Sequence, residues 1–145
     1  MRIVFGLDGV LADTSHRDWR LGEVEPQMKE YHDDSHKDRV LWPSASLYRT
    51  LWSEGHQVEV WTRRPITHKG MTVKWFQHRS LPLGLLRMCP EGDIPSYTMK
   101  RIWYRADIAD GKNGPDMVLA RNPAEIGMWR GENVFCLQVF NGGEE

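Results

Sequence analysis

Three apolar runs of the sequence each end in residues that suit binding or catalysis. The segments are Gly6-Leu7-Asp8-Gly9, Thr62-Arg63-Arg64 and Ala120-Arg121-Asn122. Guanidinium groups bind phosphate oxygens through paired N–H donors, and they also form ion pairs with carboxylates. We therefore search for a functional site in these three segments, provided that the fold brings them together.

The elements that must position these segments alternate between strand and helix. Short apolar runs predict five strands, at residues 2–6, 56–62, 83–88, 116–120 and 134–139. Helical patterns lie between them, at residues 43–54, 67–80 and 96–106 and from Asn122-Pro123 onward. Strands separated by helices of this length predict a parallel sheet that is covered on both faces. Ligands bind beyond the carboxyl ends of the strands in such sheets, where the three segments lie.

Apolar side chains at helical spacing indicate which helix faces are buried. The first helix places Leu47, Leu51 and Trp52 on one face, and Gly55 ends it. The second helix places Met71, Trp75 and Phe76 on one side. In the last helix, Asn122 is expected as the N-cap, and Ile126 and Trp129 as the packing residues.

The composition is that of one globular domain without strong charge. The chain has 145 residues, within the range of roughly 100–200 residues for one domain. Nineteen Lys and Arg residues against twenty Asp and Glu residues give a net charge of −1. This balance argues against a strongly basic nucleic-acid binder and against an acidic mimic of DNA, but it permits a local patch.

Cysteine content and hydropathy indicate a reduced, cytoplasmic protein without a membrane partner. Two cysteines cannot form a disulfide scaffold, and Cys136 lies in an apolar run where we expect it to pack as a small hydrophobe. No apolar stretch reaches the roughly 18 residues that a membrane span requires.

The segment from Phe5 to Arg17 resembles the first motif of the haloacid dehalogenase (HAD) superfamily. It is most similar to the phosphatase domain of phage-type polynucleotide kinase/3′-phosphatases. The resemblance covers nearly the whole chain: residues 60–64 stand at the second motif, Lys100 at the third, and residues 117–123 at the fourth.

The resemblance implies a fold and a small insertion. We expect an α/β three-layer sandwich with a HAD-like Rossmannoid sheet of five parallel strands in the order 5-4-1-2-3. Residues 1–145 would form a single HAD-like domain, and residues 14–38 a small cap-like insertion after strand one.

The resemblance also implies a catalytic set, of which this sequence retains half. The family uses an Asp nucleophile, a second Asp two residues later as acid/base, a Thr or Ser and a Lys that hold the phosphate, and acidic residues that hold Mg²⁺. Asp8, Thr62 and Lys100 stand at the acid/base and phosphate positions, and Lys112 is a less well aligned rival of Lys100.

The remaining catalytic positions are altered. Gly6 occupies the nucleophile position, and Ala120 and Arg121 replace the two metal-binding acids. Asn122 stands where an Arg is usual, and Arg63 where a Gly is usual. Loss of a nucleophile typically lowers the rate by about 10⁴-fold or more.

We therefore expect a catalytically dead pseudophosphatase without a cofactor, Mg²⁺ binding having been lost. It would be a phage-encoded monomer or small homo-oligomer that binds a host or phage protein, or a phosphorylated nucleic-acid end. The alternative is a weakly active phosphohydrolase that acts on a 3′-phosphate of nucleic acid or on a nucleotide, with Asp8 as the base.

Two interpretations of the basic residues remain open. Arg63, Arg64, Lys100 and Arg121 would converge on the cleft, where Arg121 replaces the charge of Mg²⁺ and binds phosphate. In the other interpretation, Arg121 only fills the vacated metal position and forms a salt bridge with Asp8.

Three features of the insertion and its flanks are also open. The resemblance implies that His16 and Arg17 face the substrate. Equally, they could be a solvent-exposed pair at the start of a helix. The run His32-Asp33-Asp34-Ser35-His36 has metal-ligand residue types but is more typical of a solvated acidic loop. Trp19 and Trp42 flank the insertion and are candidates for a contact surface.

The other tryptophans are expected in the core. The sequence contains seven tryptophans, which is several times the usual share. Five of them lie on predicted elements: Trp52, Trp61, Trp75, Trp103 and Trp129.

Overall fold

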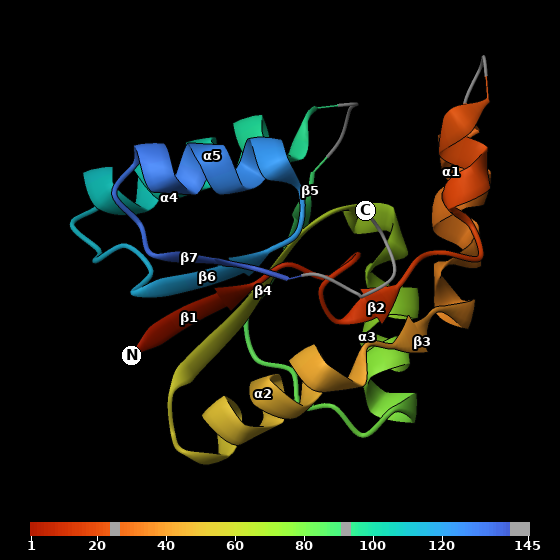
Figure 1. The fold of residues 1–145 in the computed structure, drawn as a ribbon, viewed down its shortest axis with the longest axis horizontal. Helices are drawn as coiled ribbons and strands as arrows, with labels where there is room; N and C mark the ends of the chain where they lie inside the picture. The colour runs from red at the N-terminus through yellow and green to blue at the C-terminus, as the bar shows by residue number, and fades with distance from the viewer. Residues whose placement is uncertain (24–26, 91–93, 140–145) are drawn as a thin grey trace.

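The computed structural model describes residues 1–23, 27–90 and 94–139. Its main sheet has five parallel strands in the order β5-β4-β1-β6-β7 (Figure 1). The expected strands 1 to 5 are β1, β4, β5, β6 and β7, so this is the expected order 5-4-1-2-3 read from the opposite edge of the sheet. The strands are β1 (Arg2–Phe5), β4 (Gln57–Pro65), β5 (Leu86–Cys89), β6 (Met117–Ala120) and β7 (Cys136–Gln138). The fold is therefore α/β with a parallel five-stranded sheet.

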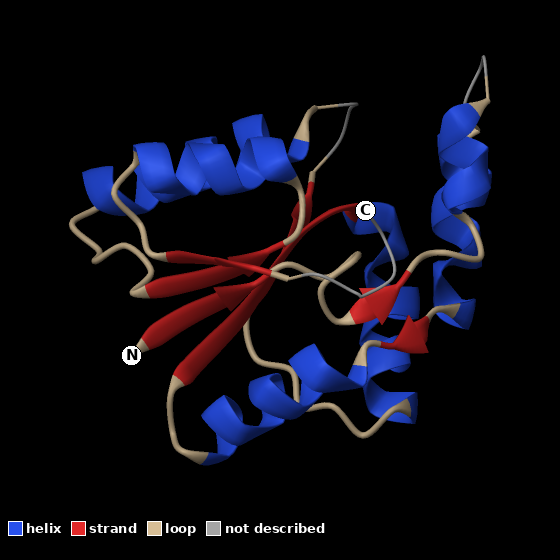
Figure 2. Cartoon of the chain, viewed as in Figure 1, coloured by secondary structure: helices blue, strands red, loops and turns tan. Residues whose placement is uncertain are grey.

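Helices cover both faces of this sheet and make a three-layer sandwich (Figure 2). Helices α2 (Trp42–Ser53) and α3 (Lys69–His78) pack on one face, and α4 (Ser96–Ala109) and α5 (Pro123–Gly131) on the other. A short helix, η3 (Ile66–His68), leads into α3.

Alternation along the strands divides the core between the two faces. In β1, Ile3 and Phe5 belong to the core beneath α2 and α3, and Val4 belongs to the core beneath α4 and α5. In β4, Val60 faces the first core and Trp61 the second. Successive side chains of a strand point to opposite faces, so a strand of a sheet buried on both sides needs apolar residues at odd and even positions alike.

Residues 14–38, which were expected to form the cap-like insertion, lie between two short antiparallel strands. These strands are β2 (Ala12–Asp13) and β3 (Arg39–Val40). Between them come η1 (Asp18–Gly22), α1 (Met28–Asp33) and η2 (Asp34–Lys37). Figure 1 shows α1 standing beyond the carboxyl ends of the main strands, apart from the four packing helices. We call residues 14–38 the cap.

The predicted elements exist, but several of their bounds differ, and one residue of a predicted helix face is exposed. The last strand, expected over residues 134–139, is only Cys136–Gln138, and Phe135 before it is 61% exposed. Leu47 was expected on the buried face of α2 but is 38% exposed. Ala45 and Tyr48 are buried on that face, and the predicted Leu51 and Trp52 pack against the same core. The ring of Tyr48 packs in the core while its phenol donates to the Pro82 carbonyl at 2.6 Å.

The N-cap prediction for α5 is confirmed. The Asn122 Oδ1 accepts hydrogen bonds from the backbone N–H groups of Ala124 (2.9 Å) and Glu125 (3.3 Å). Such a cap satisfies N–H groups that have no partner inside the helix.

The tryptophans divide as expected between core and surface. Trp61, Trp75 and Trp129 are almost fully buried, and Trp52 and Trp103 pack against the cores. Trp19 and Trp42 are 58% and 50% exposed, each beneath a guanidinium group.

Cys136 packs as a buried small residue, as predicted, and burial raises the pKa of its thiol to about 11. Among the described residues, no helix combines the length and the apolar character that crossing a bilayer requires.

Candidate anion site at the carboxyl ends of the strands

A pocket of about 190 Å³ lies where the strand ends meet the cap. The sheet contributes all three segments that the sequence singled out, together with residues of α4 and α5. The cap contributes Leu21, Met28, Tyr31 and His32. The main lining residues from the sheet side are Gly6, Asp8, Thr62, Arg63, Ser96, Lys100, Ala120, Arg121, Asn122 and Glu125.

Gly6 lines the pocket without a side chain. A Cβ atom at this position would lie 3.1 Å from Val10 Cγ2 and 3.8 Å from Lys100 Nζ. A side chain at this position would therefore begin in tight contact with Val10 and within 4 Å of the lysine amine. Gly6 does not have a positive φ, so its backbone does not require glycine.

Asp8 is bound by two arginines, through one carboxylate oxygen. Its Oδ1 accepts from Arg64 Nη2 at 2.7 Å, from Arg64 Nε at 3.0 Å and from Arg17 Nη2 at 3.0 Å. Both arginine side chains are fully buried, whereas that of Asp8 is 25% exposed and borders the pocket. Asp8 thus lies between the pocket and a buried layer of cations.

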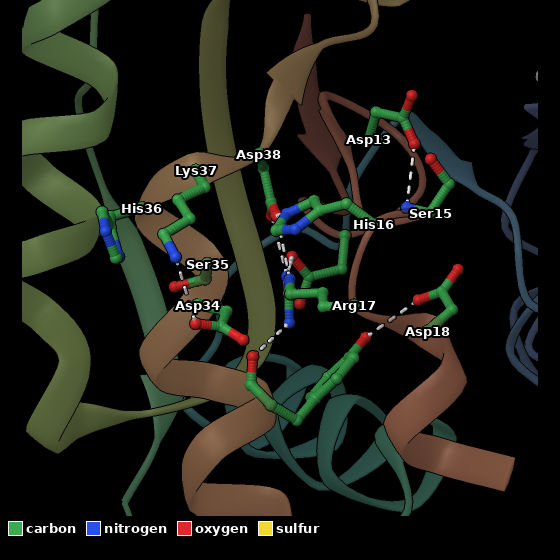
Figure 3. A network of polar contacts seen from close by, with 12 residues as sticks. Asp13, Ser15, His16, Arg17, Asp18, Asp34, Ser35, His36, Lys37 and Asp38 are labelled. Carbon is green, nitrogen blue, oxygen red and sulfur yellow. Dashed lines mark hydrogen bonds and ion pairs between the residues drawn. The ribbon is translucent and has the colours of Figure 1, made fainter.

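Asp38 is the second anion of this layer, and no sequence pattern selected it. Its Oδ1 accepts from His16 Nε2 (2.7 Å) and Arg17 Nε (2.9 Å), and its Oδ2 accepts from Arg17 Nη2 (2.8 Å) and Arg64 Nη2 (3.0 Å). Figure 3 shows the side chains of His16 and Arg17 meeting at Asp38. We call Asp8, Arg17, Asp38 and Arg64 the buried charge cluster.

The cluster shifts the pKa values of Asp8 and Arg17. Burial works to raise the pKa of Asp8, but the charges of Arg64 and Arg17 outweigh it and lower that pKa. Burial likewise works to lower the pKa of Arg17, while the hydrogen bond to Asp38 and the charge of Asp8 raise it. Asp8 is therefore a carboxylate at neutral pH, and it is held by cations.

These positions correct three expectations. One interpretation placed the Arg17 side chain in solvent, but Arg17 is fully buried. Arg64 was expected at the cleft mouth, but it lies behind Asp8, where its Nη1 also contacts Thr72 Oγ1 at 3.3 Å. Arg121 was the expected partner of Asp8 in one interpretation, but the ion pairs of Asp8 within the described chain are with Arg17 and Arg64.

Arg121 instead packs over the turn that follows Asp8. A Cβ atom built on Gly9 would lie 2.8 Å from Arg121 Cδ, and Gly9 has φ +77°. The arginine stem therefore lies against a turn that only glycine adopts easily. From there Arg121 lines the pocket.

Lys100 forms a buried ion pair with a residue that the sequence did not single out. Its Nζ lies 2.7 Å from Glu125 Oε1, and both side chains are about 5% exposed. Glu125 also accepts from Ser96 Oγ at 3.1 Å, and Trp129 Nε1 lies 3.5 Å from Oε1. Asn122 places this carboxylate by capping the first turn of α5.

Lys112, the rival of Lys100, lies outside the pocket. Its Nζ is 3.9 Å from Asp107, beside Arg2 and Asp116 at the opposite end of the sheet.

Residues 32–36 are not all exposed to solvent, and their side chains bind different partners instead of gathering at one place. His32 and Ser35 are buried, Asp33 binds Lys29 and His68, and Asp34 binds Arg20. No group of three or more His, Cys, Asp or Glu side chains is placed to hold a metal within residues 1–23, 27–90 and 94–139.

Comparisons with solved structures identify the fold. A chain of the Pnkp1/Rnl/Hen1 RNA repair complex matches 95% of this chain with a TM-score of 0.77 and 21% identity. The match spans 42% of that chain, so this chain corresponds to less than half of it. No protein-family model and no curated protein sequence matches the chain.

Two further matches have the same architecture. A haloacid dehalogenase-like family protein from Streptococcus pneumoniae matches with a TM-score of 0.59 and 11% identity, over 99% of this chain and 86% of that one. A class C acid phosphatase from Bacillus anthracis, with tungstate bound, matches with a TM-score of 0.62 and 14% identity, over 86% of this chain and 52% of that one. At these identities the likeness concerns the fold, and the chain has a HAD-like fold.

Proposed function

We propose that this chain is a catalytically inactive, HAD-like pseudophosphatase that binds a phosphorylated nucleic-acid end in the pocket. The observation that carries the proposal is that position 6 is a glycine while the Asp8 carboxylate already binds Arg17 and Arg64. Gly6 offers no atom to attack phosphorus, although covalent phosphoryl transfer requires a nucleophile at that place. The expected enzymatic alternative needs Asp8 to take a proton from water.

The contacts of Asp8 argue against that alternative. A general base works best when its pKa lies near the working pH. Two guanidinium groups bind Oδ1 of Asp8 and lower its pKa, so the carboxylate is a weak proton acceptor. We therefore expect the buried charge cluster to hold structure rather than to transfer protons.

The donor set of the pocket does not suit Mg²⁺. This ion prefers several oxygen ligands in an octahedral shell, usually carboxylates and phosphates. The two carboxylates that line the described part of the pocket are Asp8 and Glu125, and each already binds a cationic side chain at 2.7 Å. We propose that ligand binding does not require a metal.

Thr62, Arg63 and Arg121 support binding of a phosphate group. They line one pocket, and their hydroxyl and guanidinium groups are donors to phosphate oxygens. The volume of about 190 Å³ is below the roughly 300 Å³ at which pockets for whole drug-sized ligands begin. The pocket therefore suits a terminal phosphate, with the rest of the ligand outside.

The test compares two oligonucleotides of one sequence, with a 3′-phosphate or a 3′-hydroxyl end. We expect the phosphorylated one to bind roughly tenfold to a hundredfold more tightly, because one charge-assisted hydrogen bond contributes roughly 1.5–3 kcal/mol. The preference should persist in EDTA, and no phosphate should be released with Mg²⁺ present.

Arg121→Gln should remove most of the preference. The matched control is Arg105→Gln, since Arg105 is exposed on α4 and binds Glu132 away from the pocket. Equal binding of both ends by the unaltered protein would rule out the phosphate site. Phosphate release that Asp8→Asn abolishes would establish the enzymatic alternative instead.

A further inference from the structure

One stretch of the chain carries positive charge without any acidic residue. Residues 60–90 contain no Asp or Glu, whereas they contain six basic residues: Arg63, Arg64, Lys69, Lys74, Arg79 and Arg87. Helix α2 has no acidic residue either. Because the whole chain has a net charge of −1, this basic region is offset by acidic residues elsewhere. A local excess of one sign of charge attracts partners of the opposite sign.

Hydrogen bonds of two arginines join α2, the end of α3 and the cap into one surface. Arg49 of α2 donates from Nη2 to the backbone carbonyls of Arg79 (3.2 Å) and Ser80 (3.0 Å). Arg79 donates from its own Nη2 to the carbonyls of His36 (3.2 Å) and Asp38 (2.9 Å). Figure 1 shows α2, α3 and β3 together on this side of the molecule. The two guanidinium groups therefore lie close together.

Two exposed lysines extend this surface. The side chain of Lys37, in η2, is 63% exposed. Lys74 is exposed on α3, about one turn after Met71, whose sulfur accepts from Ser35 Oγ of η2 at 3.5 Å. Residues one turn apart share a side of a helix, so Lys74 lies on the side of α3 against which η2 packs.

Trp42 adds an exposed aromatic ring to these cations. Its side chain is 50% exposed, and the guanidinium of Arg49 lies 5.1 Å from the centre of its ring. We call Lys37, Trp42, Arg49, Lys74 and Arg79 the basic patch. These residues do not line the pocket at the strand ends.

The basic patch differs from other charged surfaces of the molecule, because most of its cations have no carboxylate partner. Elsewhere Arg20 binds Asp34 at 3.1 Å, and Arg105 binds Glu132 at 2.7 Å. Within the part of the chain that the structure describes, Lys74 and the two arginines of the patch form no salt bridge. Both arginines donate to neutral backbone carbonyls instead. The positive charge of the patch is therefore available to a partner.

We propose that the basic patch binds single-stranded nucleic acid, with its cations at the backbone phosphates and a base stacked on Trp42. Proteins that bind single strands without sequence preference combine a positively charged surface with aromatic side chains on which bases stack. A protein interface has an apolar centre, whereas Trp42 is the one large apolar side chain of the patch. A lone aromatic ring among cations fits a base and its phosphates better than it fits an acidic protein.

The first experiment uses the unaltered protein and therefore does not depend on the folding of a variant. The probe is a labelled oligothymidylate of about 15 nucleotides with a 3′-hydroxyl end, and fluorescence anisotropy measures its binding as the salt concentration rises. Four cations on a single strand predict a slope of about −3 for the logarithm of affinity against that of salt. Affinity should therefore fall roughly 50-fold between 50 and 200 mM salt. Absence of binding, or an affinity that salt does not change, would overturn the proposal.

The double variant Lys37→Gln/Lys74→Gln neutralises the two exposed lysines of the patch. It should make the salt slope shallower by about 1.4 and weaken binding at low salt. The matched control is Arg105→Gln/Lys112→Gln, which removes the same charge from side chains that are 66% and 59% exposed outside the patch. Equal effects of the two double variants would show attraction to the protein as a whole and would overturn the patch.

Trp42→Ala tests the stacked base. It should weaken binding of the oligothymidylate by at least about fivefold. Binding of the same strand paired with oligoadenylate should not change, because paired bases are already stacked on one another. An oligoglutamate peptide of equal length tests an acidic protein as the partner. If it bound as tightly as the oligonucleotide and Trp42→Ala changed neither, the patch would be a protein site and our assignment would be wrong.

This proposal goes beyond the phosphate site and does not rest on it. The probe ends in a hydroxyl group, so its binding to the basic patch does not require the pocket to hold a phosphate. Loss of the preference for a 3′-phosphate would refute the proposed function and leave the basic patch standing. Failure of the patch variants to change binding would refute the patch and leave the phosphate site standing.

Discussion

Asparagine in place of Asp38 removes one of the two negative charges from the buried charge cluster. In the native protein Arg17 and Arg64 are balanced by Asp8 and Asp38, and neither arginine is exposed to solvent. Asp38→Asn preserves the shape of the side chain but leaves two buried guanidinium groups for one carboxylate. It also turns an amide N–H₂ group toward donors that need an acceptor.

The expected loss is about 3–5 kcal/mol of unfolding free energy, which is typical when one partner of a buried ion pair is removed. In this variant, three hydrogen bonds from the two arginines to residue 38, at 2.8–3.0 Å in the native protein, no longer have a negatively charged acceptor. Such a loss is a large part of the roughly 5–15 kcal/mol that stabilises a typical domain. It should lower the melting temperature by roughly 10 °C for a chain of this length.

Urea denaturation followed by tryptophan fluorescence measures the change. The matched control is Asp34→Asn in the same cap, since Asp34 binds Arg20 with side chains 29% and 20% exposed. This half-buried pair remains in contact with solvent, and ion pairs that solvent screens contribute at most about 1 kcal/mol. If Asp38→Asn cost no more than Asp34→Asn, the cluster would not hold the cap to the sheet, and our reasoning would be wrong.

Two further predictions concern other charges of the site. The pKa of Asp8 is lower in the folded chain than the unfolded value of about 3.9, because Arg64 and Arg17 outweigh burial. The contribution of Asp8 to stability is therefore complete above that unfolded value and is lost as the pH falls through the folded pKa. Asp8→Asn should flatten the acid limb of a curve of unfolding free energy against pH. An unchanged acid limb would contradict this prediction. Glu125→Met should cost about 3 kcal/mol of unfolding free energy, because it strands the buried Lys100. The double variant Lys100→Met/Glu125→Met should recover most of that loss in urea denaturation. If the losses of Lys100→Met and Glu125→Met simply added in the double variant, the coupling would be refuted.

The sequence pattern predicted the architecture because apolar periodicity and turn residues are local properties. The strands at residues 2–6 and 116–120 are short, buried and apolar, and both are found within one residue of their expected bounds. On the buried face of α2 the prediction was right for Leu51 and Trp52 but wrong for Leu47. Leu47 and Tyr48 are adjacent, and only packing decides which of them turns inward.

The candidate site was predicted in part. Residues at the strand ends, such as Thr62 and Arg121, do share one pocket, since parallel strands bring their carboxyl ends to one edge. Asp38 and Glu125 were missed. Carboxylates are ordinarily exposed, and the burial of these two leaves no local signal in the sequence.

The sequence by itself determined the strand and helix order, the glycine at position 6 and the residue types at the strand ends. These are properties of single positions or of short windows. Only the tertiary structure decided which cation binds which anion. Asp8, Arg17, Asp38 and Arg64 come from four segments, and their hydrogen bonds depend on how the cap folds back onto the sheet. The pairing of Asp8 with Arg17 and Arg64, rather than with Arg121, therefore follows from long-range packing, which no spacing along the chain reveals.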